Sequence, residues 1–153
     1  MISTNVADLA WLAGIIDGEG SISVMKQTRK DRERDINYIL RISVDSTDPY
    51  MAPACGKIAG GPCILQTRDK RENCSDGLKW QVNGKQAVKV LKAILPFLKV
   101  KRAQAALAIE FQETTKKHWK HMQQEDYEKQ EELYLKLKQA KLDLKLGKGS
   151  NGP

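Results

Sequence analysis

The stretch LAGIIDGEG, residues 12–20, ends an apolar segment with two acidic residues, Asp17 and Glu19, immediately before Gly20. Acidic side chains stabilise the start of a helix and are repelled at its end, because the helix dipole is negative there. Some positive charge must therefore compensate for this pair of acids. A bound cation is one candidate for that charge.

The residues before this stretch have the spacing of a helix. Apolar side chains recur every three or four positions from Leu9 to Ile16, which predicts a helix over residues 9–19. Asp8 is the expected N-cap of this helix, and Gly20 is its expected stop.

The same helix carries a ladder of small residues, because Ala10, Gly14 and Gly18 lie four positions apart. Such a ladder leaves a groove where another backbone can approach closely, whereas an interior glycine otherwise costs about 1 kcal/mol relative to alanine. The ladder favours contact with a second helix. Packing of a strand of the same chain in the groove is the alternative.

From Ser21 the hydrophobic period changes to two, which is typical of a strand with one buried and one open face. The alternation predicts two antiparallel hairpins, and the open faces of their strands are polar and basic. Arginine and lysine can pair with guanine, and glutamine with adenine, so this face has the donors to read a major groove. A solvated sheet face is the alternative. The expected strands cover residues 21–29, 37–44, 63–70 and 78–83.

Helical periodicity returns in the intervals between and after these hairpins. Pro53 would interrupt a helix over residues 48–60, so a short or kinked element is expected there. Antiparallel strands with helices on one side make an α+β domain. The other helices are predicted over residues 85–95, 101–116 and 123–146.

The net charge of +7 is unevenly distributed. Residues 1–25 carry three acids and no lysine or arginine, whereas residues 26–102 carry 17 basic and eight acidic residues. A segment this basic favours a polyanionic partner, with nucleic acid as the leading candidate and a merely solvated surface as the alternative.

The length of 153 residues suits one domain, and the cysteine count bounds its setting. Three cysteines without metal-binding spacing are typical of reduced thiols, so an intracellular protein is expected. Neither a signal peptide nor an apolar run long enough to span a membrane is visible. The two histidines, His118 and His121, are interpreted as part of a solvated helix face.

The segment from Leu12 to Gly20 resembles the motif of the LAGLIDADG homing endonucleases, and the αββαββα order matches their fold. The similarity covers about residues 5–115. It implies an antiparallel, saddle-shaped sheet with helices on one face, followed by C-terminal helices. The implied divisions are an endonuclease domain over residues 1–116, a helical extension over 117–146 and a disordered tail over 147–153.

Only one copy of the motif is present, and family members with one copy act as homodimers. The resemblance therefore implies that the small-residue ladder packs against the same helix of a second subunit. The expected interface residues are Ala10, Ala13, Gly14 and Asp17.

The resemblance also implies a metal-dependent site at the end of the motif. Glu19 matches the family's metal-binding acid, with Gly18 beside it, and hard oxygen ligands suit Mg²⁺. Asp17 lies about 200° away around the helix, so a structural or capping role is expected. Lys101 matches a basic residue near the scissile phosphate, and Ser46 could organise solvent or cap a helix.

The implied activity is hydrolysis of both strands of a long, pseudo-palindromic DNA duplex of about twenty base pairs, with Mg²⁺ as cofactor. The alternatives are a splicing factor that binds intron RNA and a DNA-binding regulator without catalysis. The candidate DNA contacts are Ser23, Met25, Gln27, Arg29, Asn37, Ile39, Arg41, Gln66, Arg68, Lys70, Lys79 and Gln81.

Overall fold

A computed structural model describes residues 2–28, 36–66, 77–114 and 123–147 of the chain. Its four strands form one antiparallel sheet in the order β1-β2-β4-β3, as both predicted hairpins require. The strands are β1 (Gly20–Thr28), β2 (Ile36–Ser46), β3 (Cys63–Gln66) and β4 (Gly77–Asn83).

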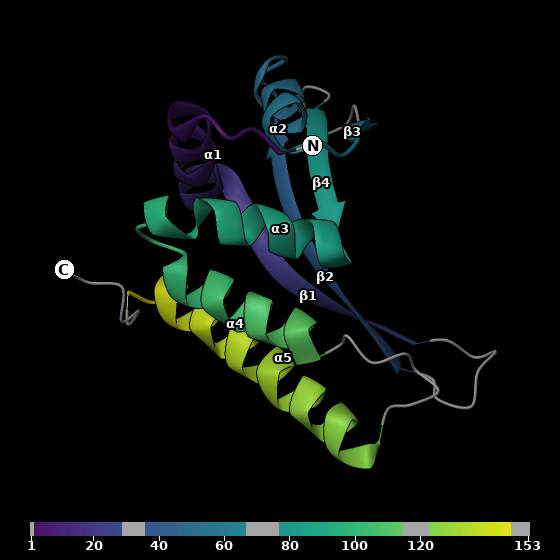
Figure 1. The fold of residues 1–153 in the computed structure, drawn as a ribbon. Helices are drawn as coiled ribbons and strands as arrows, with labels where there is room; N and C mark the ends of the chain where they lie inside the picture. Colours follow the sequence, from purple (N-terminus) through teal and green to yellow (C-terminus); the bar gives the residue numbers. More distant parts are fainter. Residues whose placement is uncertain (1, 29–35, 67–76, 115–122, 148–153) are drawn as a thin grey trace.

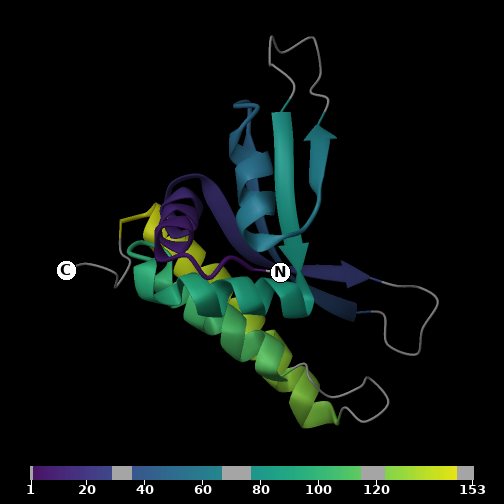
Figure 2. The same cartoon turned by 45° about the horizontal axis from the view of Figure 1, so that its top comes forward.

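The helices lie on one face of this sheet, so the expected α+β fold with an αββαββα core is confirmed (Figure 1). Figures 1 and 2 both show α4 and α5 side by side, with α3 crossing next to α4. The helices are α1 (Val6–Glu19), α2 (Met51–Ala59), α3 (Gly84–Ile94), α4 (Arg102–Thr114) and α5 (Gln124–Lys145).

Helix α1 begins earlier than its apolar spacing predicted. Asn5 is the N-cap, because its side chain accepts a hydrogen bond from the backbone N–H of Ala7 at 2.8 Å. Asp8 lies inside the first turn, where it accepts a hydrogen bond from the Ser3 hydroxyl at 2.8 Å. The prediction of Asp8 as the cap was therefore wrong, whereas the stop at Gly20 is confirmed.

Helix α2 is continuous, so the expected interruption at Pro53 was wrong. Pro53 is the third residue of the helix, where its missing N–H would have no partner within the helix. Asp48 precedes the helix and accepts a hydrogen bond from the backbone N–H of Tyr50 at 2.7 Å. The helix ends at Gly60, whose φ of 74° lies in the left-handed region that favours glycine.

The core lies between the helices and one face of the sheet, and the alternation along the strands decides which side chains enter it. Ile22, Ile42 and Trp80 are fully buried on this face, and Leu12 and Ile16 of α1 pack with them. The alternate residues of each strand therefore face away from the helices, as the period of two predicted.

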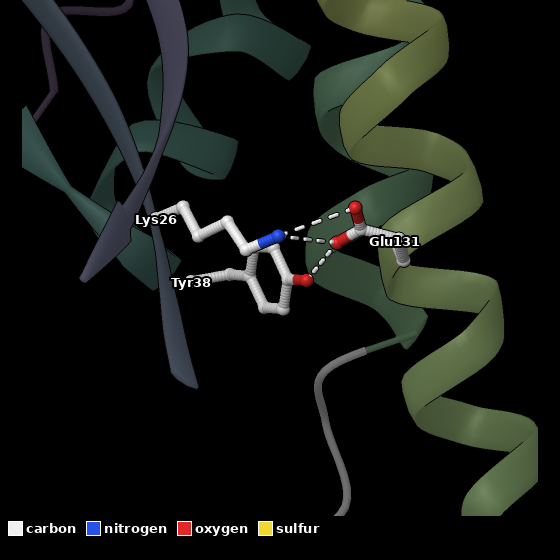
Figure 3. A network of polar contacts seen from close by, with 3 residues as sticks. All are labelled: Lys26, Tyr38 and Glu131. Atoms are coloured by element: carbon white, nitrogen blue, oxygen red, sulfur yellow. Dashed lines mark hydrogen bonds and ion pairs between the residues drawn. The ribbon is translucent and has the colours of Figure 1, made fainter. Parts of the chain in front are cut away.

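Helix α5 is attached to the sheet by a polar network (Figure 3). The carboxylate of Glu131 accepts hydrogen bonds from the Tyr38 hydroxyl and from the Lys26 ammonium, the latter at 3.3 Å. The bond from Tyr38 holds the pKa of Glu131 below its ordinary value of 4.5. Burial, together with the bond to Glu131, raises the pKa of Tyr38. The folded state therefore favours the charged form of Glu131.

Glu131→Gln is expected to lower the free energy of unfolding near neutral pH, because it removes the charge from the bonds to Tyr38 and Lys26. The expected loss is only about 1 kcal/mol, since solvent screens this partly exposed group. A folded-state pKa below 4.5 means that wild-type Glu131 contributes stability above pH 4.5. That contribution is lost as the pH falls through the lowered pKa. Denaturant unfolding should therefore show the two proteins converging in acid, and a constant difference down to the lowest pH would contradict this account.

Within the described residues, no helix combines the length and apolar character needed to cross a membrane. Cys55 and Cys63 are free thiols. Several predictions lie outside the described residues: the DNA contacts Arg29, Arg68 and Lys70, the two histidines, and the tail from residue 148.

Candidate active site and nucleic-acid interface

Glu19 is the last residue of α1, and its side chain is exposed. The chain turns directly from helix to strand at Gly20, with no loop between them. A Cβ atom at Gly20 would lie 2.7 Å from the Cα of Ile16, so only glycine fits this junction. The turn therefore holds Glu19 at the edge where the helix meets the sheet.

The end of α1 is neutralised by Lys101, which precedes α4. Its ammonium donates hydrogen bonds to the backbone carbonyls of Ile16 at 2.7 Å, Asp17 at 3.0 Å and Gly20 at 2.7 Å. A lysine ammonium has three donors, and all three are used here. Lys101 therefore supplies positive charge at the helix end that carries Asp17 and Glu19.

Asp17 completes this junction from the other side. Its two carboxylate oxygens accept hydrogen bonds from the backbone N–H groups of Lys99 at 2.7 Å and Lys101 at 2.9 Å. The predicted capping role of Asp17 is confirmed. Its additional assignment to a dimer interface stays a prediction.

Burial lowers the pKa of Lys101, and the charge on Asp17 opposes that shift. Lys141 of α5 lowers the pKa of Lys101 further, whereas Glu19 raises it. Lys101 is therefore close enough to both Glu19 and Lys141 for their charges to act on it. The predicted contact of Lys101 with a phosphate would require one of its three carbonyl bonds to break.

Ser46 ends β2 at the same end of the sheet as the motif, because Gly20 pairs with Val44. Its hydroxyl accepts a hydrogen bond from the backbone N–H of Asp48 at 3.0 Å. This is a local turn bond and not a helix cap, because α2 begins only at Met51 and its N-cap position is Tyr50. The role of Ser46 in organising solvent stays a prediction.

The described part of one chain contains no group of three or more histidine, cysteine, aspartate or glutamate side chains that could hold a metal ion. Glu19 is exposed and has no hydrogen-bond partner among the described residues, whereas both oxygens of Asp17 are occupied. Gly18, which precedes Glu19 in the sequence, is also exposed. The donor set fits a hard divalent cation only if further oxygen ligands come from a second subunit or from phosphates.

The register brings the candidate contacts of β1 and β2 together on the open face. Ser23 pairs with Arg41, Met25 with Ile39, and Gln27 with Asn37. The predicted assignment of these six residues to one open face is therefore confirmed.

Strands β3 and β4 extend the same face. Ser43 of β2 pairs with Gln81, and Gln66 pairs with Gly77 of β4. Lys79 pairs with Ile64 of β3 and lies on this face too. The four strands therefore carry the candidate contacts across the width of the sheet.

Asn83 is a member of the open face that the candidate contacts did not include. Its Oδ1 accepts a hydrogen bond from the Nε of Arg41 at 3.0 Å, and the two residues are paired across β2 and β4. The bond fixes the direction of the Arg41 guanidinium. The alternation of β4 placed Asn83 on this face and could have identified it.

The small-residue ladder of α1 is open to solvent. Ala10, Gly14 and Gly18 are exposed, and a Cβ atom at either glycine would meet nothing within 4 Å. The alternative, in which a strand of the same chain fills the groove, is therefore wrong for the described residues. Trp11 lies beside the ladder with 40% of its surface exposed.

Ala13 was expected to face a second subunit, and this expectation was wrong. Ala13 is fully buried among the core residues of its own chain. It lies on the side of α1 that carries Leu12 and Ile16, whereas Ala10 and Gly14 lie on the exposed side. The 3.6-residue period separates these neighbours around the helix.

The model of the family described as LAGLIDADG endonuclease matches residues 12–118 of this chain. This match begins at the motif and spans both hairpins. The chain belongs to the LAGLIDADG endonuclease family.

A LAGLIDADG relative with a known activity supports the same assignment. The DNA endonuclease I-CvuI of Chlorella vulgaris is 30% identical over 118 residues, which cover 72% of this chain and 68% of that protein. The relative is thus similar over most of the described fold.

Solved LAGLIDADG structures share this fold. I-CvuI in complex with its target in the presence of calcium is 24% identical, with a TM-score of 0.71 over 88% of this chain and 84% of that one. The archaeal intron-encoded endonuclease I-Vdi141I complexed with DNA is 16% identical, with a TM-score of 0.72 over 87% and 83%. A further I-CvuI complex, formed with magnesium present, contains uncleaved DNA.

Proposed function

We propose that this chain is a site-specific homing endonuclease that cleaves both strands of a long, pseudo-palindromic DNA duplex. The observation that carries the proposal is the position of Glu19, which lies exposed at the helix-to-strand turn where the sheet begins. The described open face of that sheet is polar and carries Arg41 and Lys79. An acid at the position of Glu19 repels DNA unless a cation lies between them. Family membership and the solved relatives bound to DNA support the same reading.

The active form in this proposal is an intracellular homodimer. One chain contributes a single motif acid, and its ladder of Ala10, Gly14 and Gly18 is open along α1. Packing this helix against its symmetry mate would bring two copies of Glu19 together and join the two open faces. The paired faces would then read two half-sites of the duplex.

Each group in the site has a distinct task. The open face binds the duplex and reads base edges through side chains such as Arg41. Lys101 and Asp17 hold the end of α1 and so fix the position of the Glu19 backbone, and the oxygens of Glu19 offer ligands for a divalent cation. Mg²⁺, when bound, neutralises charge on the phosphate and lowers the pKa of a water molecule.

Cleavage of a randomised duplex library in the presence of Mg²⁺ tests the proposal. The expected result is recovery of pseudo-palindromic sites of about twenty base pairs, cut in both strands. Saturating binding of recovered duplexes without any cut would instead favour a DNA-binding regulator. Preference for structured intron RNA over every duplex would favour a splicing factor.

Arg41→Ala is expected to weaken binding of a recovered duplex by about 1–3 kcal/mol, because Arg41 is held by Asn83 in a direction suited to a base contact. Fluorescence anisotropy with duplexes substituted at single positions should also show relaxed specificity at one base pair. Lys92→Ala is the matched control, because Lys92 pairs with Glu113 on the helical side. Equal losses in both variants would contradict a specific contact.

A further inference from the structure

Helix α5 brings a second lysine to the end of the motif. The Nζ of Lys141 donates to the Oγ of Ser21 at 3.3 Å, although 120 residues separate them in the sequence. Ser21 directly follows Gly20 in β1 and pairs with Ser43 on the open side of the alternation. Since β1 is an edge strand, Lys141 reaches around the sheet to its open face.

A shallow hollow of about 220 Å³ marks the same place. Ser23 lines it and is the next open-face residue after Ser21, and Lys138 borders it one helical turn before Lys141. The ammonium of Lys141 thus lies next to the start of the open face, whereas the ammonium of Lys138 lies over the ring of Tyr134. The complete lining is Ser23, Val24, Tyr134, Leu137, Lys138 and Lys141.

The two lysines near Glu19 differ in what their ammonium groups contact. Lys101 gives all three donors to backbone carbonyls at 3.0 Å or less. Lys141 makes one longer bond, to the neutral hydroxyl of Ser21. Burial lowers the pKa of Lys141, so an anion beside it would favour its charged form.

We propose that Lys141 is the ammonium that binds a DNA backbone phosphate beside Glu19, while Lys101 holds the helix end. The inference rests on the proposed function, since its ligand is the phosphate of a bound duplex. It assigns to α5 a direct part in the site, whereas the sequence indicated only a charged helical extension after the αββαββα order ends. The C-terminal helix then contributes to the site from the side of β1.

Three variants test this assignment. Lys141→Met removes the charge, Lys141→Arg keeps it, and Lys136→Met removes a charge from the same helix where Lys136 pairs with Glu132 at 2.8 Å. Affinity for a mixed-sequence DNA duplex is measured over a range of KCl concentrations with Ca²⁺ present. Each lost phosphate contact lowers the slope of log affinity against log salt by about 0.9, so the proposed homodimer, which carries two copies of Lys141, should lose about 1.8.

The expected result is that reduced slope in Lys141→Met alone, with the wild-type slope in Lys141→Arg and Lys136→Met. Cleavage of a recovered duplex by Lys141→Met should be slower by about a hundredfold. Thermal unfolding checks the fold, and Lys141→Gln, which keeps a polar tip near Ser21, replaces the methionine variant if that one does not fold.

A wild-type slope and cleavage rate without the Lys141 charge would overturn the assignment. An equal loss in Lys136→Met would overturn it too, because the effect would then come from net charge. If the wild-type chain cuts no duplex at all, the proposed endonuclease function fails, and the salt slopes still decide whether Lys141 contacts phosphate.

Discussion

Glu19→Gln is expected to slow DNA cleavage by at least about a thousandfold while DNA affinity is kept or raised. The substitution keeps the shape of the side chain and removes the charge that would hold a divalent cation. Metal stabilisation of a reacting phosphate is worth several kcal/mol, and each 1.4 kcal/mol is a factor of ten in rate. Affinity is retained because the contacts of the open face are untouched and one repulsive charge is lost.

Single-turnover cleavage of a recovered duplex and anisotropy in Ca²⁺ measure the two quantities separately. Glu132→Gln is the matched control, because Glu132 is an exposed carboxylate of α5 that pairs with Lys136. This control should cut at the wild-type rate. Cleavage by Glu19→Gln at that rate would refute the role of Glu19, and a parallel loss of binding would indicate a structural role instead.

Gly14→Leu is expected to convert the proposed homodimer into monomers. A side chain of this size in the groove would hold two α1 helices apart, and a twofold axis between them would place it there twice. Overpacking costs about 1–3 kcal/mol at each copy, so the dimer dissociation constant should rise between about thirtyfold and ten-thousandfold. Sedimentation of the two proteins over a concentration series measures this constant.

The monomer itself should not suffer from this change. A Cβ atom at Gly14 meets nothing within 4 Å, and leucine favours helix over glycine by almost 1 kcal/mol, about the difference between glycine and alanine. Gly14→Ala serves as the graded control, with a smaller rise in the dissociation constant. A Gly14→Leu dimer of wild-type strength would show that the ladder is not the contact surface.

Local pattern was enough to predict the architecture. The change of period at Ser21 located the helix-to-strand turn, and the alternation along β2 assigned Arg41 to the open face and Ile42 to the core. Both signals depend only on neighbouring residues and on one buried face, so they are readable in a single sequence. The same reasoning predicted α4 and α5 within a few residues.

The contacts that shape the site could not be read in this way. The bonds from Lys101 to the end of α1 join residues more than 80 positions apart, and no local period marks them. The position of Lys141 depends on how α5 packs against β1, which Glu131 and Tyr38 help to determine. The exact start of α2 could not be predicted either. The helix begins at Met51, later than expected, so Pro53 falls in its first turn, where proline is tolerated.

The reciprocal bonds between Asp17 and Lys101 have a consequence for how such a protein can change its target. Each bond joins the side chain of one residue to the backbone of the other, so replacing either side chain removes one of these bonds and leaves the other. The end of α1 therefore depends on contacts between residues 84 positions apart. On the open face of the sheet, by contrast, the side-chain bond described above is a local one, between Arg41 and its cross-strand neighbour Asn83. Changes of target sequence can therefore be made by substituting side chains of the open face, while the residues at the end of α1 that are proposed to cut the DNA stay the same.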